Sequence, residues 1–554
     1  MKNLWDFVRQ DMIGSDATIQ TPFGERVLSY ADFTASGRGL HSIEQYINGL
    51  LRHYANTHTE DDATGRITSQ RLAQAEQLIK ERLGADENYK LISVGAGATA
   101  AIIRLQQILG IYLPPATRER LSSAGLIDFQ SPAVQARRPV VFVGPYEHHS
   151  NEISWREGFC EVVEIELNQH GYLDLADLEA KLQDPRWARR PRFGSFSAAS
   201  NVSGIRTDVY AVARILHRHG ARAFFDFSAA APYVRISVNH DQESYFDAVF
   251  FSPHKYIGGP GASGILLIRE DIYRQDLPPS ISGGGTVTFV NASSQDYIND
   301  IEEREKAGTP GIFQTFRSAL VLDLQHRLGI DEIARREEEL TRYAIERLSA
   351  TKNIDIIGAA PPEDRLAIFS FNIRTGRGYL HPRFVVRLLN DLFGIQSRAG
   401  CSCAGPYGHR LLHIDIDTSE IYRNYIRAGS HGVKPGWVRL NFHYLFTPED
   451  VEFLCAAIEF IAREGHLFLQ EYTFDPRGGA WQHIQEPEQT GTFGAEAALA
   501  GTEPDHKISE ADRNQLRSDY LTQAVERAAQ LRGSFQESAL HEAAEDLIPF
   551  WYMQ

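Results

Sequence analysis

Short apolar runs alternate with amphipathic segments over roughly the first three hundred residues of the chain. Seven runs are rich in β-branched and aromatic residues: YKLISVG, RPVVFVG, VVEIEL, FGSFSA, RAFFDFS, DAVFFS and GILLIRE. Segments with helical spacing separate some of them, such as residues 66–84 and 208–220. Strands that alternate with helices predict an α/β domain with a largely parallel sheet.

The pattern changes after about residue 315. A long helical region at 317–350 leads into RLAIFSFNIR and then WVRLNFHYLFTPEDVEFLCAAIEFI, which predicts a second, smaller α+β domain. Glycine, proline and polar residues dominate 472–507 and predict a linker or irregular wrap. Helical spacing then returns, with Ser509 as a plausible N-cap. The predicted organisation is an N-terminal arm contributing to the small domain (1–45), a large domain (46–315), a small domain (316–470) and a linker with a helical extension (471–554).

Composition narrows the class of protein. The 554 residues are 43% hydrophobic and 23% charged, which is ordinary for a soluble globular protein. A formal net charge of −16 argues against nonspecific nucleic-acid binding. No apolar run reaches the roughly 18 residues that span a membrane, and the N-terminus does not resemble a signal peptide. Four cysteines cannot form a disulfide framework, so a reducing cytoplasm is the expected compartment.

Polar clusters follow the apolar runs: GAGAT, EHHSN, SNVSG, DFS and SPHK. In parallel sheets, ligands bind beyond the carboxyl ends of the strands. Lys255 in SPHK would by itself more often be a solvated surface charge. Asp226, however, ends the apolar strand RAFFD, and a carboxylate buried there needs a cationic partner. A pyridinium N–H is such a partner, which raises the possibility of a pyridoxal phosphate (PLP) site.

PLP enzymes need a lysine, an acid for the ring nitrogen, a flat group over the ring and donors for the phosphate. The GAGAT loop at 95–99 offers backbone N–H groups and the Thr99 hydroxyl near a predicted helix N-terminus; a tight turn is the alternative. His148 could lie flat on a ring or be a structural histidine. Asn201 could bond the ring hydroxyl or make a turn, and Ser252 and His254 could join the phosphate shell or terminate a strand.

A series of motifs in order along residues 15–465 carries a family resemblance: YADFTASG, GAGAT, EHHSN, SNVSG, FFDFS, SPHKYIGGPG, GGGT and EKAGTPG. The chain resembles fold-type I PLP enzymes of aminotransferase class V, and among them most the cysteine desulfurase and selenocysteine lyase branch. The resemblance implies a large domain with a mostly parallel seven-stranded sheet and a smaller α+β domain.

The resemblance also implies roles for individual residues. Lys255 would hold the cofactor covalently, Asp226 would pair with the pyridine nitrogen and His148 would stack on the ring. Asn201 would contact the ring hydroxyl and help to bind substrate. The residues implied for the phosphate are Gly97, Ala98, Thr99, Ser252 and His254. Thr309 in AGTPG would reach the phosphate of the neighbouring subunit, which implies a homodimer with composite active sites.

The stretch QSRAGCSCAGPYGHR at 396–410 contains two cysteines one residue apart. No second pair or histidine cluster completes a zinc set, so the alternatives are a small flexible loop or a nucleophile activated near Arg398. By resemblance Cys403 is the nucleophile that becomes a persulfide. Cys401 could resolve that persulfide, form a disulfide or be incidental. Cys160 and Cys455 lie in apolar patterns and are predicted to be inert core residues.

Arg439 in GWVRLNFHY matches the family arginine that grips the substrate α-carboxylate; a surface arginine at a strand edge is the alternative. Three features depart from the family. Ala229 stands where a glutamine is usual, and Ser228 could substitute for it. The insert at 404–438 could form a lid or a pocket for a larger substrate. The extension at 471–554 could brace a dimer, cover the active site or dock a partner.

These observations predict a cytoplasmic, homodimeric PLP enzyme that cleaves the C–S bond of cysteine or a cysteine-derived substrate through a Cys403 persulfide. A sulfur-acceptor protein is a possible partner; nucleic acid and membrane are not expected. One rival keeps the cofactor but makes Cys403 structural, as in an aminotransferase, an epimerase or a β-eliminating lyase. The other rival is a non-catalytic scaffold with a PLP-enzyme fold.

Overall fold

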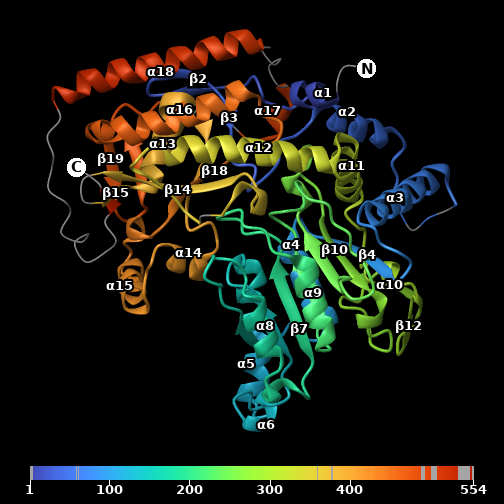
Figure 1. Cartoon of the computed structure of the whole chain (residues 1–554). Helices are drawn as coiled ribbons and strands as arrows, with labels where there is room; N and C mark the ends of the chain where they lie inside the picture. Colours follow the sequence, from blue (N-terminus) through green and yellow to red (C-terminus); the bar gives the residue numbers. More distant parts are fainter. Residues whose placement is uncertain are drawn as a thin grey trace. The chain divides into compact units, whose positions relative to one another are not determined.

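The computed structural model describes residues 4–57, 59, 61–358, 360–375, 378–487, 493–500, 508–534 and 550–551 (Figure 1). The chain forms two compact units. Unit 1 consists of residues 35–335 and 364–366, and unit 2 consists of residues 2–34, 336–363 and 367–554. The long helix α12 (Ile330–Ser349) begins in unit 1 and continues in unit 2.

Unit 1 is built on a seven-stranded sheet whose spatial order is β4-β10-β9-β8-β7-β5-β6. Strands β9, β8, β7, β5 and β6 pair in parallel, whereas β10 is antiparallel to both β9 and β4. The α/β fold with a mostly parallel seven-stranded sheet is therefore confirmed, and all seven apolar runs supply its strands. Their bounds are β4 (Tyr89–Val94), β5 (Val140–Val143), β6 (Glu161–Glu164), β7 (Arg192–Ser197), β8 (Arg222–Asp226), β9 (Ala248–Phe251) and β10 (Gly264–Arg269).

Both faces of this sheet are covered, which explains why its strands are continuously apolar. Helix α4 packs on the face that carries Ile92, Phe224 and Leu266. Leu216 of α9 lies against Gly194 on the opposite face. The other elements of unit 1 are α2 (His41–Leu50), α3 (Ala63–Arg82), α4 (Ala98–Ile108), α5 (Pro115–Ser123), α6 (Pro132–Gln135), α7 (Ile153–Arg156), α8 (Leu175–Leu182), α9 (Val209–Arg218), β11 (Val287–Val290), β12 (Gln295–Tyr297), α10 (Ile301–Arg304) and α11 (Ile312–Leu328).

Unit 2 contains a second sheet of order β17-β18-β14-β15-β21, with β13 paired to β14. Helices α13 and α16 contribute to one continuous apolar core with this sheet. The elements are α1 (Leu4–Gln10), β1 (Thr18–Thr21), β2 (Gly24–Val27), β3 (Ser29–Tyr30), β13 (Ile354–Ile356), β14 (Ile368–Thr375), β15 (Gly378–Leu380), α13 (Pro382–Phe393), β16 (Ile395–Gln396), β17 (Arg398–Gly400), α14 (Gly405–Leu411), α15 (Ile416–Arg427), β18 (Trp437–Asn441), α16 (Pro448–Glu464), β19 (Tyr472–Asp475), β20 (Ala480–His483), α17 (Ala495–Ala500), α18 (Glu510–Arg532) and β21 (Phe550–Trp551).

Residues 18–34 of the predicted N-terminal arm are built into unit 2. Strand β3 pairs in parallel with β16, which directly follows α13. The turn between α13 and β16 contains Gly394 in the left-handed region (φ 70°), and a Cβ there would lie 2.3 Å from the carbonyl oxygen of Val27. Only glycine therefore allows the arm to approach so closely.

The segment predicted as a linker or irregular wrap differs from that expectation in its first part. Strands β19 and β20 form an antiparallel hairpin at 472–483. The alternating residues Tyr472, Phe474 and Trp481 face the core, where the Trp481 ring lies 4.7 Å from that of Phe384. The proline- and glycine-containing turn DPRGGA lies where the two short strands meet, so the sequence favoured a loop over an alternating strand pattern. Farther along, Ser509 caps α18 by accepting from the Asp512 amide, which confirms the predicted N-cap.

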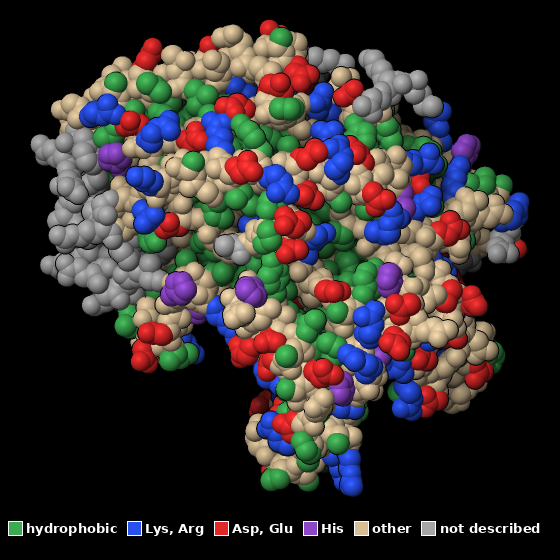
Figure 2. Space-filling view, in the orientation of Figure 1, with side chains coloured by type: hydrophobic (Ala, Val, Ile, Leu, Met, Phe, Trp, Pro, Cys, Tyr) green, Lys and Arg blue, Asp and Glu red, His purple; other side chains and the backbone are tan. Residues whose placement is uncertain are grey.

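Acidic and basic side chains are interspersed on the face of the molecule shown in Figure 2. On that face the negative net charge of the chain is not gathered into one patch. No helix among the described residues combines the length and the apolarity that a membrane crossing requires.

Candidate active site

The predicted cofactor residues follow strands whose carboxyl ends meet at one edge of the large sheet. Asp226 ends β8, and its register partners are Ser197 of β7 and Phe250 of β9. Lys255 follows β9 in a single 3₁₀ turn, Pro253–Lys255. The clusters GAGAT, EHHSN and SNVSG follow β4, β5 and β7. The parallel topology thus places five separate motifs at the same edge, where α/β sheets bind ligands.

The first turn of α4 and the turn after β9 meet directly. The Ala98 amide donates to Ser252 Oγ at 2.9 Å. A Cβ at Gly97 would lie 2.9 Å from Ser252 Oγ and 3.6 Å from His254 Nε2, so glycine keeps this cradle open. Burial, and then the charge of Lys255, lowers the pKa of His254 to about 4, so its imidazole is neutral at physiological pH. Four of the five predicted phosphate residues therefore meet around the N-terminus of α4, a favourable place for an anion, and the fifth, Thr99, is the second residue of that helix.

Thr99, the fifth, is linked to His148 through Ser150. The Thr99 and Ser150 hydroxyls lie 2.7 Å apart, and the Ser150 amide donates to His148 Nδ1 at 3.2 Å. Ser150 was not among the predicted site residues, although it lies inside the EHHSN motif. This series of hydrogen bonds joins the loop after β5 to the first turn of α4.

Asp226 is buried, and its Oδ1 accepts from the Ser228 amide at 2.8 Å. Burial raises the pKa of Asp226, while hydrogen bonding from Ser228 and the positive charge of Lys255 oppose that rise. A carboxylate in this position is stabilised by any further cationic donor. Ala229, which replaces the usual family glutamine, is also buried.

These residues fit PLP on three observations: the open cradle at Gly97, the buried acid Asp226 and the half-buried amine of Lys255. A pyridinium N–H is the kind of cation that relieves the cost of an ionised Asp226. Asn201 is buried in the turn after β7. Thr309 lies in an exposed loop, where its hydroxyl accepts from Asn56 Nδ2 at 3.0 Å.

Glu147 is a buried acid that sequence reasoning missed. Its carboxylate accepts from the Ser197 amide at 2.8 Å, the Ser197 hydroxyl at 2.6 Å and Asn151 Nδ2 at 2.6 Å. Burial raises the pKa of Glu147 to about 7, and the nearby charge of Asp226 adds to that rise. Glu147 lies four residues after the end of β5, and its burial depends on contacts that no local pattern reveals. Glu147 fixes the turn that leads into His148.

In unit 2, Arg439 lies on β18 and is buried. It pairs with Asp32 of the arm, with Nη2 3.1 Å from Oδ1. The other carboxylate oxygen of Asp32 accepts from Arg398 Nε at 2.9 Å. Asp32 was also missed, although YADFTASG contains it. Arg439 is therefore not a surface arginine.

Cys401 and Cys403 are both free and exposed. They lie in the turn after β17, where Ser402 and Cys403 adopt positive φ values of 51° and 56°. The described residues contain no cluster of side chains suited to a metal ion. Cys160 and Cys455 are buried as predicted, and burial raises the pKa of each thiol to about 12. The exposed pair alone among the four is accessible for chemistry.

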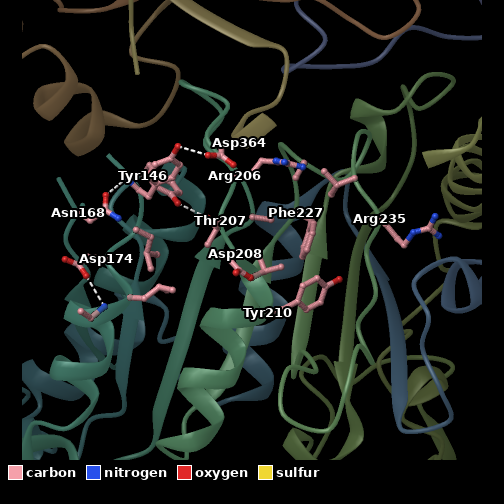
Figure 3. A pocket seen from close by; sticks show the side chains of 18 residues that line it. Tyr146, Asn168, Asp174, Arg206, Thr207, Asp208, Tyr210, Phe227, Arg235 and Asp364 are labelled. Atoms are coloured by element: carbon pink, nitrogen blue, oxygen red, sulfur yellow. Dashed lines mark hydrogen bonds between the residues drawn. The ribbon is translucent and has the colours of Figure 1, made fainter. Parts of the chain in front are cut away.

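Two cavities of about 800 Å³ open in unit 1. One lies beside the GAGAT loop and includes Gly95, Ala96 and His254. The other lies by the carboxyl ends of β7 and β8, near Thr207 and Phe227, and none of its described lining residues is a predicted site residue (Figure 3). There the hydroxyls of Tyr146 and Thr207 lie 2.8 Å apart and join the loops after β5 and β7.

Comparison with known proteins identifies the family of this chain. The model of the aminotransferase class-V family matches residues 128–454, more than half of the chain. A probable cysteine desulfurase of Streptomyces coelicolor is 29% identical over 326 residues, which are 58% of this chain and 69% of that protein. A probable cysteine desulfurase of Halobacterium salinarum is 30% identical over 317 residues, 56% of this chain and 67% of the relative.

Solved structures agree on the fold. The apo structure of a cysteine desulfurase from Thermococcus onnurineus matches with a TM-score of 0.64 at 23% identity, covering 83% of this chain and 98% of that one. A cysteine desulfurase from Escherichia coli matches with a TM-score of 0.61 at 19% identity, covering 84% and 99%. The expected fold-type I architecture is confirmed. The chain belongs to the aminotransferase class-V family of PLP-dependent enzymes, in the branch that contains the cysteine desulfurases.

Proposed function

We propose that this protein cleaves the C–S bond of cysteine or a cysteine-derived amino acid and takes up the sulfur on Cys403. The observation that carries the proposal is an exposed thiol in the turn after β17, the strand paired with the one that carries Arg439. Relatives named as probable cysteine desulfurases support the same reaction.

In this proposal Gly97, Ala98, Thr99, Ser252 and His254 hold the phosphate of PLP. Asp226 pairs with its ring nitrogen, His148 covers the ring and Asn201 meets the ring hydroxyl. Thr309 reaches the phosphate of a second subunit in a cytoplasmic homodimer. When bound, PLP supplies the electron sink that lets the substrate Cα lose its proton.

The chain's own groups perform the remaining steps. Arg439 grips the α-carboxylate, and the Lys255 amine accepts the α-proton. Cys403 Sγ forms a bond to the substrate sulfur as the substrate Cβ–S bond breaks. The balance is cysteine plus the Cys403 thiol giving alanine plus the Cys403 persulfide, whose outer sulfur then passes to an acceptor thiol.

Replacing Cys403 tests the proposal. We expect Cys403→Ser to abolish alanine and persulfide formation from cysteine, because a hydroxyl cannot replace the thiolate as a sulfur acceptor. The visible absorbance of bound cofactor should persist in this variant and be lost in Lys255→Ala. Cys401→Ser is the matched control and should still form the persulfide. Unchanged turnover in Cys403→Ser would favour another class V reaction with a structural Cys403.

A further inference from the structure

Asp32 bridges two arginines that face each other across a strand pair. Arg398 of β17 and Arg439 of β18 are direct register partners. Like charges directly opposite each other in a sheet are destabilising. Asp32 offers one carboxylate oxygen to each, at 2.9 Å from Arg398 Nε and 3.1 Å from Arg439 Nη2. One carboxylate thus holds two guanidinium groups together.

The backbone fixes Asp32 on both sides. The Ala31 amide donates to the Gln396 carbonyl at 2.9 Å, and the Asn441 amide donates to the Ala31 carbonyl at 2.8 Å. The Thr34 amide and hydroxyl both donate to Asn441 Oδ1, at 2.8 and 2.6 Å. The carboxylate therefore projects from a segment tied to the strand that carries Arg439. This rigidity suits a residue that sets the position of another.

The local charge balance also matches an amino-acid substrate. Two guanidinium groups and one carboxylate leave one net positive charge, which one α-carboxylate would neutralise. Burial lowers the pKa of Arg439, and the charge of Asp32 opposes that effect. Arg439 also interacts electrostatically with Cys403.

We propose that Asp32 is a positioning residue for the α-carboxylate: it orients Arg439 and joins it, through Arg398, to the strand that leads into the Cys403 turn. The proposal rests on the role given to Arg439 under the proposed function. It does not depend on which reaction follows, because every amino-acid substrate presents the same carboxylate.

The test measures carboxylate recognition without sulfur chemistry. The cofactor-loaded enzyme is titrated calorimetrically with L-alanine and with ethylamine, which lacks the carboxylate. We expect Asp32→Asn to weaken alanine binding at least about tenfold and to leave ethylamine binding unchanged, because misplacing one polar contact has effects of that size. With substrate, KM should rise more than kcat falls.

Asp391→Asn is the matched control, because Asp391 is a buried acid in the same unit whose arginine partner is Arg387, at 2.7 Å. The Asp391→Asn variant should have a lower free energy of unfolding and should bind alanine as wild type does. If Asp32→Asn does not fold, Asp32→Glu replaces it in the test. The longer side chain keeps the charge but cannot hold both guanidinium groups at these distances. Alanine binding should again weaken.

Three results would overturn the inference: unchanged alanine binding in the Asp32 variants, equal weakening in Asp391→Asn, or a wild-type enzyme that binds alanine no better than ethylamine. A failure of the proposed function would give a different experimental result from a failure of this inference. An enzyme that binds alanine through Asp32 but releases no sulfur from cysteine would contradict the desulfurase assignment alone.

Discussion

Burial shifts the pKa values of several side chains at the carboxyl edge of the large sheet. Asp226, Glu147 and His254 all have pKa values shifted toward the neutral form, because each is removed from water. Only Asp226 has a nearby cationic side chain, Lys255, that opposes the shift. A protonated ring nitrogen would complete that compensation, so under the proposed function Asp226 is the residue that tunes the bound heterocycle.

Replacing Asp226 by asparagine keeps the size and removes the charge. We expect kcat to fall by about a hundredfold or more, since a preorganised electrostatic contact contributes that much, while the cofactor stays bound through Lys255. The measurement is turnover alongside cofactor stoichiometry. Asp391→Asn is the control, because Asp391 is a buried acid of unit 2 that pairs with Arg387, and this variant should keep its turnover. Equal turnover in wild type and Asp226→Asn would refute the pairing.

Among the elements, α18 of the C-terminal extension holds the N-terminal arm. In Figure 1 it lies beside α16, and it contacts α13 and β2 as well. The Val27 amide donates to Tyr520 Oη at 3.1 Å, and Arg517 Nη2 donates to Ser29 Oγ at 3.2 Å. The Arg26 guanidinium lies 4.4 Å from the centroid of the Tyr520 ring. The extension therefore braces the segment that ends in Asp32.

Tyr520→Phe isolates this brace. The ring and its contact with Arg26 remain, but the buried Val27 amide loses its acceptor. We expect the free energy of unfolding to fall by about 1–3 kcal/mol, the cost of an unsatisfied buried donor. Denaturant titration measures it. Thr522→Ala on the exposed side of α18 removes a comparable hydroxyl and should change stability little. Equal losses in both variants would argue against the brace.

At the scale of the whole molecule, a buried acid of unit 2 links two segments of that unit that are separated along the chain. The chain passes between the units at 34/35, 335/336, 363/364 and 366/367. Glu337 lies just after the passage at 335/336, and its Oε2 accepts from the amide of Ala367, just after the passage at 366/367, at 3.2 Å. Burial raises the pKa of Glu337 to about 8, although backbone hydrogen bonds from Ala367 and Tyr444 oppose the rise.

A carboxyl whose pKa is higher in the folded than in the unfolded chain stabilises the fold when protonated. That stabilisation is complete below the ordinary glutamate pKa of about 4.5 and is lost as the pH rises through about 8. We expect wild-type stability to decline over this range by roughly 2–4 kcal/mol more than that of Glu337→Gln. Calorimetry at pH 5, 7 and 9 checks it; parallel curves for the two proteins would contradict it. Glu147 also has a raised pKa, but it is present in both proteins and therefore does not change the difference between their stability curves.

Strand pattern and strand-end chemistry could be predicted from the sequence. The seven apolar runs all became strands of one sheet, and the polar motifs after them came together because parallel strands share a carboxyl edge. The hairpin at 472–483 escaped prediction, because two strands of four residues give too short an alternation beside a glycine-rich turn. Glu147 escaped because its burial depends on Ser197 and Asn151, contacts that no local pattern reveals.

The sequence by itself determined the α/β class, the family resemblance and the candidate groups proposed to hold PLP, since these depend on local pattern and residue type. Tertiary structure alone decided the bridge from Asp32 to Arg398 and Arg439 and the brace from α18 to the arm. Their partners are separated by several hundred residues along the chain. Packing of the two ends of the chain, rather than any periodicity, brings such groups together.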